Sequence, residues 1–499
     1  MASESIVINN FARPSLALDE LAVPNRSSPP NENVSILMDT DEKSFGGYQP
    51  VVFINGSYVE KFIESFELDM TGFMPVLRFK FTMEDPLFIS VNYPKDGDVV
   101  SVYLRSWVSA YKPLRMDFNV LKVQSSPSTT YEGEGMTFQV LGETRIPRLY
   151  NEVSKAFRGK TSYETLFDVS QELDLGFSSN EAEVTDEMTW ICPNISYYDF
   201  IQEVVSRSYK DDRSFFFSFI DCYYNLNFIN LNNQLTADDP LQTAMVIRGM
   251  GSRETDDTSF PGTELVEYEL PLFLNNQKGN NDLPFFITGY TLLSDAGNIA
   301  NRTGYVQEVQ FWDEGLEAED QLEKYIKYTI ESITTENVGE NMILQKGRPK
   351  EKDYQREYRK NWYGVLNNFE NGGVHQNFIQ ALAQNTLNLE DVSKFVLQVR
   401  TVSYYPGFYR GMVLPVGIYV NKQGFRKENV GVNQNQNPEQ SINPVLDTFL
   451  SGVYVLIGFQ VKYDPINGLY MHLNLTKREW TLNSAGQFPK FFPINFISG

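Results

Sequence analysis

The stretch TWICPNISYYDFIQEVVSRSYKDDRSFFFSFIDCYYNLNFINL, from Thr189 to Leu231, has the clearest local pattern in the chain. Pro193 ends an extended segment, and Ser196 is placed to cap a helix that has Asp199 at its third position. The turn KDDR then separates this helix from two aromatic-rich runs that indicate a hairpin. The stretch therefore predicts a strand, a helix and a β-hairpin, and it contains no nucleophile beside a base, no metal-ligand spacing and no phosphate loop.

A second helix is predicted immediately upstream, in TSYETLFDVSQELDLGF from Thr161 to Phe177. Thr161 stands three residues before Glu164, which is the spacing of a capping box, and Gly176 is a typical stop. Together with the opening stretch, this segment predicts an α+β unit in which helices pack on a small sheet.

Alternating strands lie on both sides of this unit. From Gln49 to Tyr150 the period is 2, as in VLRFKFTM (76–83), and turn signals such as KDGD and EGEG predict an antiparallel barrel or sandwich. Alternation resumes near Phe285 and is clear in GVYVLIGFQVKY (452–463). The chain thus offers two β-domains of comparable strand count.

A helical insertion is expected to interrupt the second β-domain. DEGLEAEDQLEKYIKYTIESI, from Asp313 to Ile333, has acidic residues in its first turns, where the helix dipole favours them. Its apolar residues form a stripe at helical spacing. The stripe consists of Leu316, Leu322, Ile326 and Ile330.

The composition limits the classes of function. The chain has 499 residues with 36 Phe, 28 Tyr and 5 Trp, an aromatic content that favours β-structure. A formal charge of −22 argues against a protein that grips nucleic acid by neutralising phosphates. Two cysteines, Cys192 and Cys222, are too few for a disulfide scaffold and fit a reducing cytoplasm. We expect no membrane-spanning run and no signal peptide.

Few residues in the chain favour catalysis. With only two histidines, His375 and His472, a Ser-His-Asp or Cys-His hydrolase and a typical zinc site are disfavoured. His472 lies on the polar face of a predicted strand, and His375 is placed at the start of a predicted helix. The 64 acidic residues leave room for a carboxylate pair, but nothing singles out an acid with a raised pKa. We therefore expect no catalytic, cofactor-binding or metal-ligating residues.

The order of parts resembles the central hub proteins of contractile phage-tail baseplates, a family that includes the hub region of type VI secretion spike proteins and the late-control tail proteins. The residues that carry the resemblance are Thr161 to Phe177 and Trp190 to Leu231. In that family a Trp, a Ser and two aromatic residues precede or open the second helix, before a Phe-rich hairpin. The matching positions here are Trp190, Ser196, Tyr198 and Phe200.

The C-terminal part carries the same resemblance. GMVLPVGIYVN (411–421) is similar to a family strand with a Pro and a Gly, and the segment 452–477 is similar to its closing hairpin. The chain departs from the family in its longer N-terminal arm, its polar segment at 236–283 and its larger insertion. It also lacks the oligosaccharide-binding barrel and the β-helix of the fused spike proteins, which favours a separate hub chain.

The resemblance implies a structural protein and not an enzyme. Two β-barrel tube domains per chain would let a homotrimer form a pseudo-sixfold ring that joins the sixfold tail tube to the threefold central spike and lets DNA pass. The implied partners are the spike, tail tube and baseplate wedge proteins, and the tape measure protein is a further candidate. No specific nucleic-acid binding and no stable membrane insertion are implied. The implied location is the virion, with assembly in the host cytoplasm.

The expected fold class is α+β, mainly β, and the expected organisation has six parts. They are an N-terminal arm (1–48), a first tube β-barrel (49–150), an α+β domain with a polar loop segment (151–283), a second tube β-barrel (284–313 and 376–482), a helical insertion (314–375) and a C-terminal tail (483–499).

One basic segment is a candidate site for docking a partner. KGRPKEKDYQREYRKNW, from Lys346 to Trp362, interleaves basic and aromatic residues. Docking on an acidic neighbouring chain, stacking on nucleic acid and a plain solvated helix all remain open. The candidate docking residues are Tyr354, Arg356, Tyr358, Arg359 and Trp362.

The acidic balance of the chain has two readings. Part of the negative charge is expected to line a channel that passes DNA without gripping it, and general solubility is the alternative. Two other function classes stay open: a tail-tip peptidoglycan hydrolase and a peripheral β-protein that binds carbohydrate or a receptor. A sugar-sized cleft with an acid of raised pKa would indicate the first, and a tandem lectin-like repeat the second.

Overall fold

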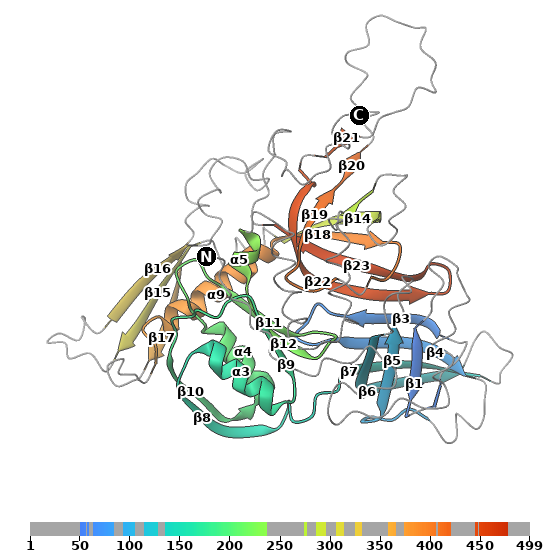
Figure 1. Ribbon diagram of the computed structural model, residues 1–499, viewed down its shortest axis with the longest axis horizontal. Helices are drawn as coiled ribbons and strands as arrows, with labels where there is room; N and C mark the ends of the chain where they lie inside the picture. Colours follow the sequence, from blue (N-terminus) through green and yellow to red (C-terminus); the bar gives the residue numbers. More distant parts are fainter. Residues whose placement is uncertain are drawn as a thin grey trace, which may run out of the picture.

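The computed structural model places the helices and strands in Figure 1. It describes residues 50–55, 57–58, 63–83, 93–104, 114–127, 135–236, 274–276, 286–295, 306–313, 325–331, 358–365, 374–405, 408–420, 445–447 and 449–477. The expected N-terminal arm (1–48), most of the polar segment and the C-terminal tail (483–499) lie outside these ranges.

The α+β unit predicted from the opening stretch is present, and we call it the platform. Its elements are β8 (Glu152–Lys160), α3 (Ser162–Glu172), β9 (Gly176–Ser179), β10 (Met188–Ser196), α4 (Tyr197–Ser206), β11 (Phe216–Ile220), β12 (Asn225–Asn230) and α5 (Leu231–Leu235). Strand β10 pairs with β8, and β11, β12 and β9 form a three-stranded sheet. Helices α3 and α4 cover these strands (Figure 1).

The local signals of the platform act as the sequence predicts. The Thr161 side chain accepts a hydrogen bond from the Glu164 backbone N–H, and the Glu164 side chain accepts one from the Thr161 backbone N–H, which completes the capping box. The Ser196 side chain accepts from the Asp199 N–H at the start of α4. The predicted hairpin is β11 with β12.

One large sheet of thirteen strands lies beside the platform. Its main path runs β14-β18-β23-β22-β3-β4-β7-β6-β5-β1-β2, and β19 and β13 branch from β22. The strands are β1 (Val51–Ile54), β2 (Ser57–Tyr58), β3 (Ile63–Asp69), β4 (Val76–Met83), β5 (Val99–Leu104), β6 (Leu114–Pro127), β7 (Met136–Thr144), β13 (Leu274–Asn275), β14 (Ile287–Ser294), β18 (Phe395–Thr401), β19 (Val413–Gly417), β22 (Gly452–Asp464) and β23 (Gly468–Thr476). A separate small pair joins β20 (Tyr419–Val420) to β21 (Val445–Leu446). The chain is therefore mainly β, as expected, with antiparallel pairing dominant.

The two arms of this sheet repeat one strand order. In the first β-unit, β3, β4, β7, β6 and β5 pair in succession, all antiparallel. In the second β-unit, β14, β18, β23, β22 and β19 pair in the same succession and sense. The repeat ends beyond them, because β1 is antiparallel to β5 whereas β13 is parallel to β19.

Two β-bulges fall at the same places in both units. The first strand of each unit has a bulge against the second, at Glu64 in β3 and at Thr288 in β14. The fourth strand has one against the third, at Leu121 in β6 and at Ile457 in β22. Because a bulge shifts the register by one residue, this coincidence aligns the two units residue by residue.

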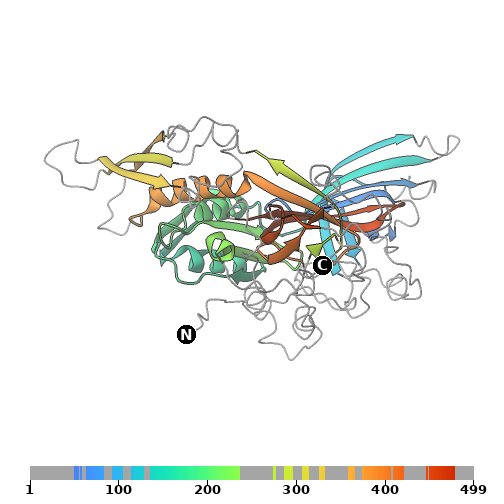
Figure 2. The same ribbon diagram turned by 90° about the horizontal axis from the view of Figure 1, so that it is seen from above.

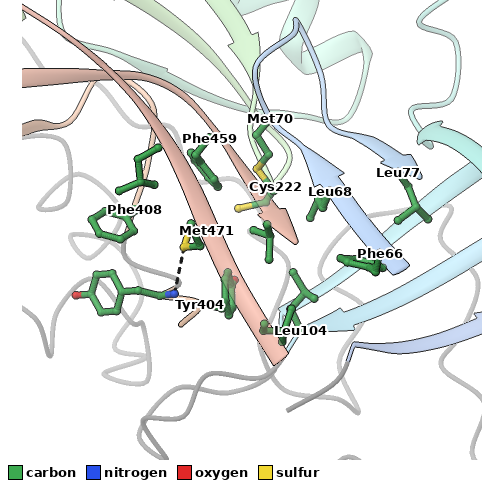
Figure 3. Close-up of a cluster of buried hydrophobic side chains, with 14 of the residues drawn as sticks. Phe66, Leu68, Met70, Leu77, Leu104, Cys222, Tyr404, Phe408, Phe459 and Met471 are labelled. Atoms are coloured by element: carbon green, nitrogen blue, oxygen red, sulfur yellow. Dashed lines mark hydrogen bonds between the residues drawn. The ribbon is translucent and has the colours of Figure 1, made fainter. Parts of the chain in front are cut away.

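The two units are joined at a seam, where β22 pairs with β3. The register pairs Gln460 with Asp69 and Tyr463 with Phe66. Buried side chains from both sides of the seam form one apolar core. In Figure 3, Leu68 and Met70 lie near Phe459, and Cys222, from the turn of the β11–β12 hairpin, lies among them.

The expected helical insertion is wrong where the structure describes it. The segment contains the strands β16 (Tyr325–Glu331) and β17 (Tyr358–Val365), which flank β15 (Val306–Asp313) in a sheet of their own. Ile326 and Ile330 are four residues apart, a spacing that fits a helix but also equals two strand periods. Because a partner strand is available, the run YIKYTIE, which is rich in aromatic and β-branched residues, adopts a β-strand conformation.

This small sheet also corrects the expected limits of the second β-domain. Strand β15 falls within 284–313, yet it pairs with β16 and β17 and not with the large sheet. The helix in this region is α9 (Phe378–Ser393), which contacts β15, β16 and α4. His375 lies just before α9, as expected for a residue near a helix start.

Candidate functional site

The seam is a close backbone contact. Along one edge, β22 pairs with β23, and along the other it pairs first with β19 and then with β3. At Gly458, between these two partners, a Cβ atom would lie 3.1 Å from Cα of Thr71. A side chain there would push β3 away, so glycine permits the approach of the two units.

Charged residues bridge the seam on the solvent side of the sheet. Arg78 Nη1 lies 2.8 Å from Glu67 Oε1 and 3.3 Å from Asp69 Oδ2. Lys462, from the other β-unit, places Nζ 3.4 Å from Glu67 Oε2. Glu67 therefore holds cations of both units, although exposed pairs of this kind contribute little to stability.

The same face is hollowed around the seam. The hollow has a volume of about 520 Å³. Its lining comes from β3, β4, β6, β7, β22 and β23, so both units contribute. The lining residues are Ser65, Phe66, Glu67, Arg78, Phe79, Lys80, Lys122, Gln124, Gln139, Val140, Leu141, Lys462, Tyr463, Asp464 and Tyr470.

The acidic groups beside the hollow are held in their charged form. Burial raises the pKa of Asp69, but hydrogen bonds from Thr71 and Arg78 outweigh burial and leave the pKa below its ordinary value. Glu64 behaves similarly, because Lys80 and Thr82 offset the effect of burial on its pKa. A charged, cation-bound carboxylate is a poor proton donor, so this geometry suits recognition better than acid catalysis.

Among the described Asp and Glu side chains, the carboxyl group of Asp186 has a raised pKa. Its hydrogen bonds hold the fold together and do not face the hollow. Burial raises the pKa, while hydrogen bonds from the backbone N–H groups of Ser162 and Tyr209, each 2.9 Å, oppose that effect. The group lies inside the platform and not at the hollow. It ties the start of α3 to the segment after α4.

The platform is fastened beneath the seam by Arg410. Its Nε donates to the Ile457 carbonyl at 2.7 Å, and Nη1 donates to the Gly72 carbonyl. The guanidinium also stacks 4.4 Å from the ring of Phe219 in β11. Burial lowers the pKa of Arg410 to about 9, although Asp69 acts in the opposite direction. One side chain thus joins both β-units to the platform.

A second fastening lies under the first β-unit. The Asp117 N–H donates to the Tyr224 hydroxyl at 3.0 Å, and that hydroxyl donates to the Asp117 carbonyl at 3.2 Å. The Asp117 carboxylate, fully buried, accepts two hydrogen bonds from Arg115, at 3.1 and 3.0 Å. The β11–β12 hairpin is therefore bonded to the sheet and does not merely pack against it.

Helix α9 holds the other side of the platform through buried amides. Gln384 donates to the carbonyls of Asp211, in the KDDR turn, and of Ser214, directly after it. Asn385 donates to the Ser208 carbonyl at 3.0 Å and accepts from the Phe216 N–H at 2.9 Å. These bonds fix the turn that leads into β11.

His375 completes this contact. Its Nε2 lies 3.0 Å from the Arg207 carbonyl at the end of α4, and its ring lies between Trp190 and Phe378. Burial lowers the pKa of His375 to about 4, against the hydrogen bond to Arg207. The imidazole is therefore neutral near pH 7. His472, on the polar face of β23 as predicted, is half-buried.

The candidate docking residues are not assembled into a described site. Tyr354 and Arg356 lie outside the described residues. Tyr358, Arg359 and Trp362 lie in β17, where they pair in register with Val306, Gln307 and Gln310 of β15. The plain solvated helix, one of the three readings left open for this segment, is therefore wrong for Tyr358–Val365, which is a strand.

Sequence reasoning missed the residues that fasten the seam. Arg410 and Tyr224 act across long separations in the chain, and neither belongs to a local motif. A weak signal was present in GVYVLIGFQV, where Gly458 interrupts an otherwise apolar strand. An isolated glycine in a strand indicates a bulge or a close backbone approach.

Within the described ranges, no three His, Cys, Asp or Glu side chains gather closely enough to hold a metal ion. Cys192 and Cys222 are buried free thiols. Among the described helices, none has both the length and the apolar character needed to span a membrane.

Comparison with known proteins gives structural neighbours only. No model of a known protein family matches the sequence, and no curated protein matches it either. A tail protein from Neisseria meningitidis MC58 is 12% identical, with a TM-score of 0.46 over 86% of this chain and 97% of that one. The 43 kDa tail protein of prophage MuSo2 from Shewanella oneidensis is 9% identical, with a TM-score of 0.47 over 87% of this chain and 100% of that one.

A third neighbour is an E. coli component of the type VI secretion system, described as similar in structure to the T4 bacteriophage tail proteins gp27 and gp5. It is 7% identical, with a TM-score of 0.37 over 88% of this chain and 79% of that one. The structural neighbours are phage tail proteins and type VI secretion spike-like proteins, the classes that the order of parts in the sequence resembles.

Proposed function

We propose that the chain is the structural hub of a contractile-tail baseplate, in which three copies form a pseudo-sixfold ring. The observation that carries the proposal is the repeat of the two β-units, with the same strand order and the same two bulges. The units are joined head to tail, because the fourth strand of one pairs with the first strand of the other. A head-to-tail contact that recurs between copies closes into a ring when its rotation allows.

Two β-units per chain would let a threefold assembly match a sixfold one. Three chains would present six similar β-units to a sixfold tail tube, while each platform would occur three times, as a threefold spike requires. The spike, the tail tube and the wedge proteins are the proposed partners, with the tape measure protein as a further candidate. The place of action would be the baseplate of a virion assembled in the host cytoplasm.

The platform supplies rigidity in this proposal. Arg410 and Tyr224 bond it to the sheet on both sides of the seam, and the amides of α9 fix its turn. A hub has to keep the angle between neighbouring β-units while the tail contracts. The aromatic hairpin of the opening stretch would set that angle, which gives it a role without chemistry.

The polar face would suit a channel wall. Arg78 and Lys462 share Glu67, and Lys80 is bound to Glu64, so cations on this face already have carboxylate partners. A wall of paired charges offers phosphate little to hold, and the acidic balance of the chain would repel it further. The segment from Lys346 to Trp362 would lie outside the bore and dock on an acidic neighbour.

The solution mass tests this proposal first. Light scattering on the purified chain, alone and with the candidate spike protein, is expected to give a trimer or a complex of three chains with three spike chains. A stable monomer under both conditions would contradict the hub and its ring.

A further inference from the structure

The head-to-tail seam leaves two equivalent strand edges open. Within the chain, β22 of the second unit pairs with β3 of the first. The bulges identify β6 as the counterpart of β22 and β14 as the counterpart of β3. These two strands carry edges at the opposite ends of the repeat, far apart in Figure 1.

Both edges are open in the part of the chain that the structure describes. Strand β5 pairs with β6 as far as Asn119, and Val120 exchanges hydrogen bonds with Gly97 and Asp98. Beyond the bulge at Leu121, the segment Lys122–Pro127 has a described partner strand on one side alone, β7. The outer part of β6 projects with β7 beyond the rest of the sheet in Figure 2. Strand β14 pairs with β18, and its other edge has no described partner.

Apolar side chains are exposed on both edges, and one of them has a buried counterpart at the seam. Phe66 in β3 is 2% exposed, whereas Tyr290, its counterpart in β14, is 39% exposed. Leu293 in β14 is 49% exposed and Leu121 in β6 is 46% exposed. Open edges with exposed apolar side chains invite a further strand.

We propose that β6 of one copy pairs with β14 of a second copy of this chain, in the register of the seam. The inference rests on the proposed function for the existence of a ring, and it adds the contact that closes it. Carrying the seam register over by the two bulges pairs Gln124 with Leu293 of the partner subunit and Pro127 with Tyr290 of the partner subunit. Between them, Ser126 pairs with Thr291 of the partner subunit.

A second copy is the occupant that the geometry specifies. The seam shows that a strand with the bulge pattern of β6 accepts a strand with the bulge pattern of β14. The polar and apolar faces also match, because Leu292 continues the core side and Thr291 the solvent side, as Leu68 and Glu67 do at the seam. An unrelated strand would have neither bulge in place.

A disulfide tests the register. At the seam, the Met70 N–H donates to the Phe459 carbonyl at 2.9 Å, so Glu67 and Lys462, three residues farther along, form a non-hydrogen-bonded pair. Such pairs bring Cα atoms to a distance that a disulfide accepts. The equivalent pair across copies is Ser126 with Thr291 of the partner subunit.

The full-length variant with Ser126→Cys and Thr291→Cys is oxidised and run on a non-reducing gel. We expect covalent dimers and trimers that return to single chains with a thiol reductant. Ser125→Cys with Thr291→Cys shifts the register by one residue and is expected to give none. Glu67→Cys with Lys462→Cys is the matched control and is expected to close within one chain.

The outcomes separate this inference from the proposed function. A mass of three chains without the 126–291 disulfide, while the 67–462 disulfide forms, would overturn the interface and leave the hub standing. The 126–291 disulfide at a different mass would support the interface and contradict the ring of three. If neither the trimer mass nor the 126–291 disulfide is found, both the hub and the interface are overturned. If the 67–462 disulfide does not form, the register of the seam, from which the register between copies is taken, is overturned.

Discussion

The seam and the open edges use equivalent strands in different surroundings. At the seam, β3 is covered by β22 and supported from below by the platform through Arg410. At the open edges, β14 and the outer half of β6 have the same bulges, but each has a described partner on one side only. The exposure of Tyr290, compared with Phe66, follows from what lies beside the strand and not from the strand itself. The apolar side chain at this position is therefore buried where a second β-unit pairs with the strand and exposed where none is described.

The largest expected effect is the difference in unfolding free energy between alanine substitutions at Phe66 and at Tyr290. Phe66→Ala empties a buried site and is expected to lower the free energy of unfolding by about 3–5 kcal/mol at any protein concentration. Tyr290→Ala is expected to cost a single copy about 1 kcal/mol or less, because the ring is already partly exposed. It should instead shift the assembly toward smaller masses on dilution.

Urea unfolding and light scattering at two protein concentrations check this pair. Equal losses of unfolding free energy in both variants, with unchanged masses, would show that the two sites do not differ in the way described.

A smaller effect on stability is expected from acidification, which acts on His375 in the contact between α9 and the end of α4. The pKa of His375 is about 4 in the folded protein and near 6.5 when exposed. Between these values the unfolded chain binds the proton more readily, so the contribution of His375 to stability falls as the pH falls from 6.5 to 4. The linked loss is up to about 3 kcal/mol.

The measurement is urea unfolding at pH 7, 5.5 and 4 for the wild type and for His375→Gln. The difference in unfolding free energy between them is expected to shrink on acidification, because the variant lacks the titrating group. His472→Gln serves as a control at a half-exposed site, where a smaller change is expected. A difference that stays constant with pH would exclude His375 as the acid-sensitive tie.

The smallest effect on stability is expected at Glu67. Glu67→Gln removes the carboxylate that Arg78 and Lys462 share, and exposed pairs of this kind contribute about 1 kcal/mol or less. Arg78 keeps its second partner, Asp69, but Lys462 loses its carboxylate. The freed Lys462 should raise the affinity for a short DNA duplex at low salt, and the gain should fade as salt rises.

Fluorescence anisotropy with a labelled duplex measures this, with Glu183→Gln, at an exposed position between β9 and β10, as a control of equal charge change. A gain of the same size in the control would assign the effect to net charge and not to the polar face.

Local signals in the sequence predicted local structure well. The capping residues Thr161 and Ser196 act as expected, and the alternation around His472 gives a half-buried strand. These features depend on residues within one turn or one strand of each other. The mainly β class of the chain followed from the same kind of pattern.

The pattern failed where two periods coincide. Between Tyr325 and Glu331 the apolar spacing fits a helix and a strand equally, and the partner strand β15 decides the outcome. The helical reading of the segment with the candidate docking residues failed for the same reason, since pairing with β15 makes Tyr358–Val365 a strand. Local composition cannot report a partner that is distant in the chain.

By itself, the sequence determined the mainly β class, the helix–helix–hairpin platform and the absence of an evident nucleophile or metal spacing in the opening stretch, because caps, turns and side-chain periods are local. Only the tertiary structure decided that β22 pairs with β3, that Arg410 fastens both units to the platform, and that the two units share their bulges. Those features depend on contacts between residues hundreds of positions apart, such as Gly72 with Arg410. Such contacts are selected by the packing of the whole core, and no short stretch of sequence encodes them.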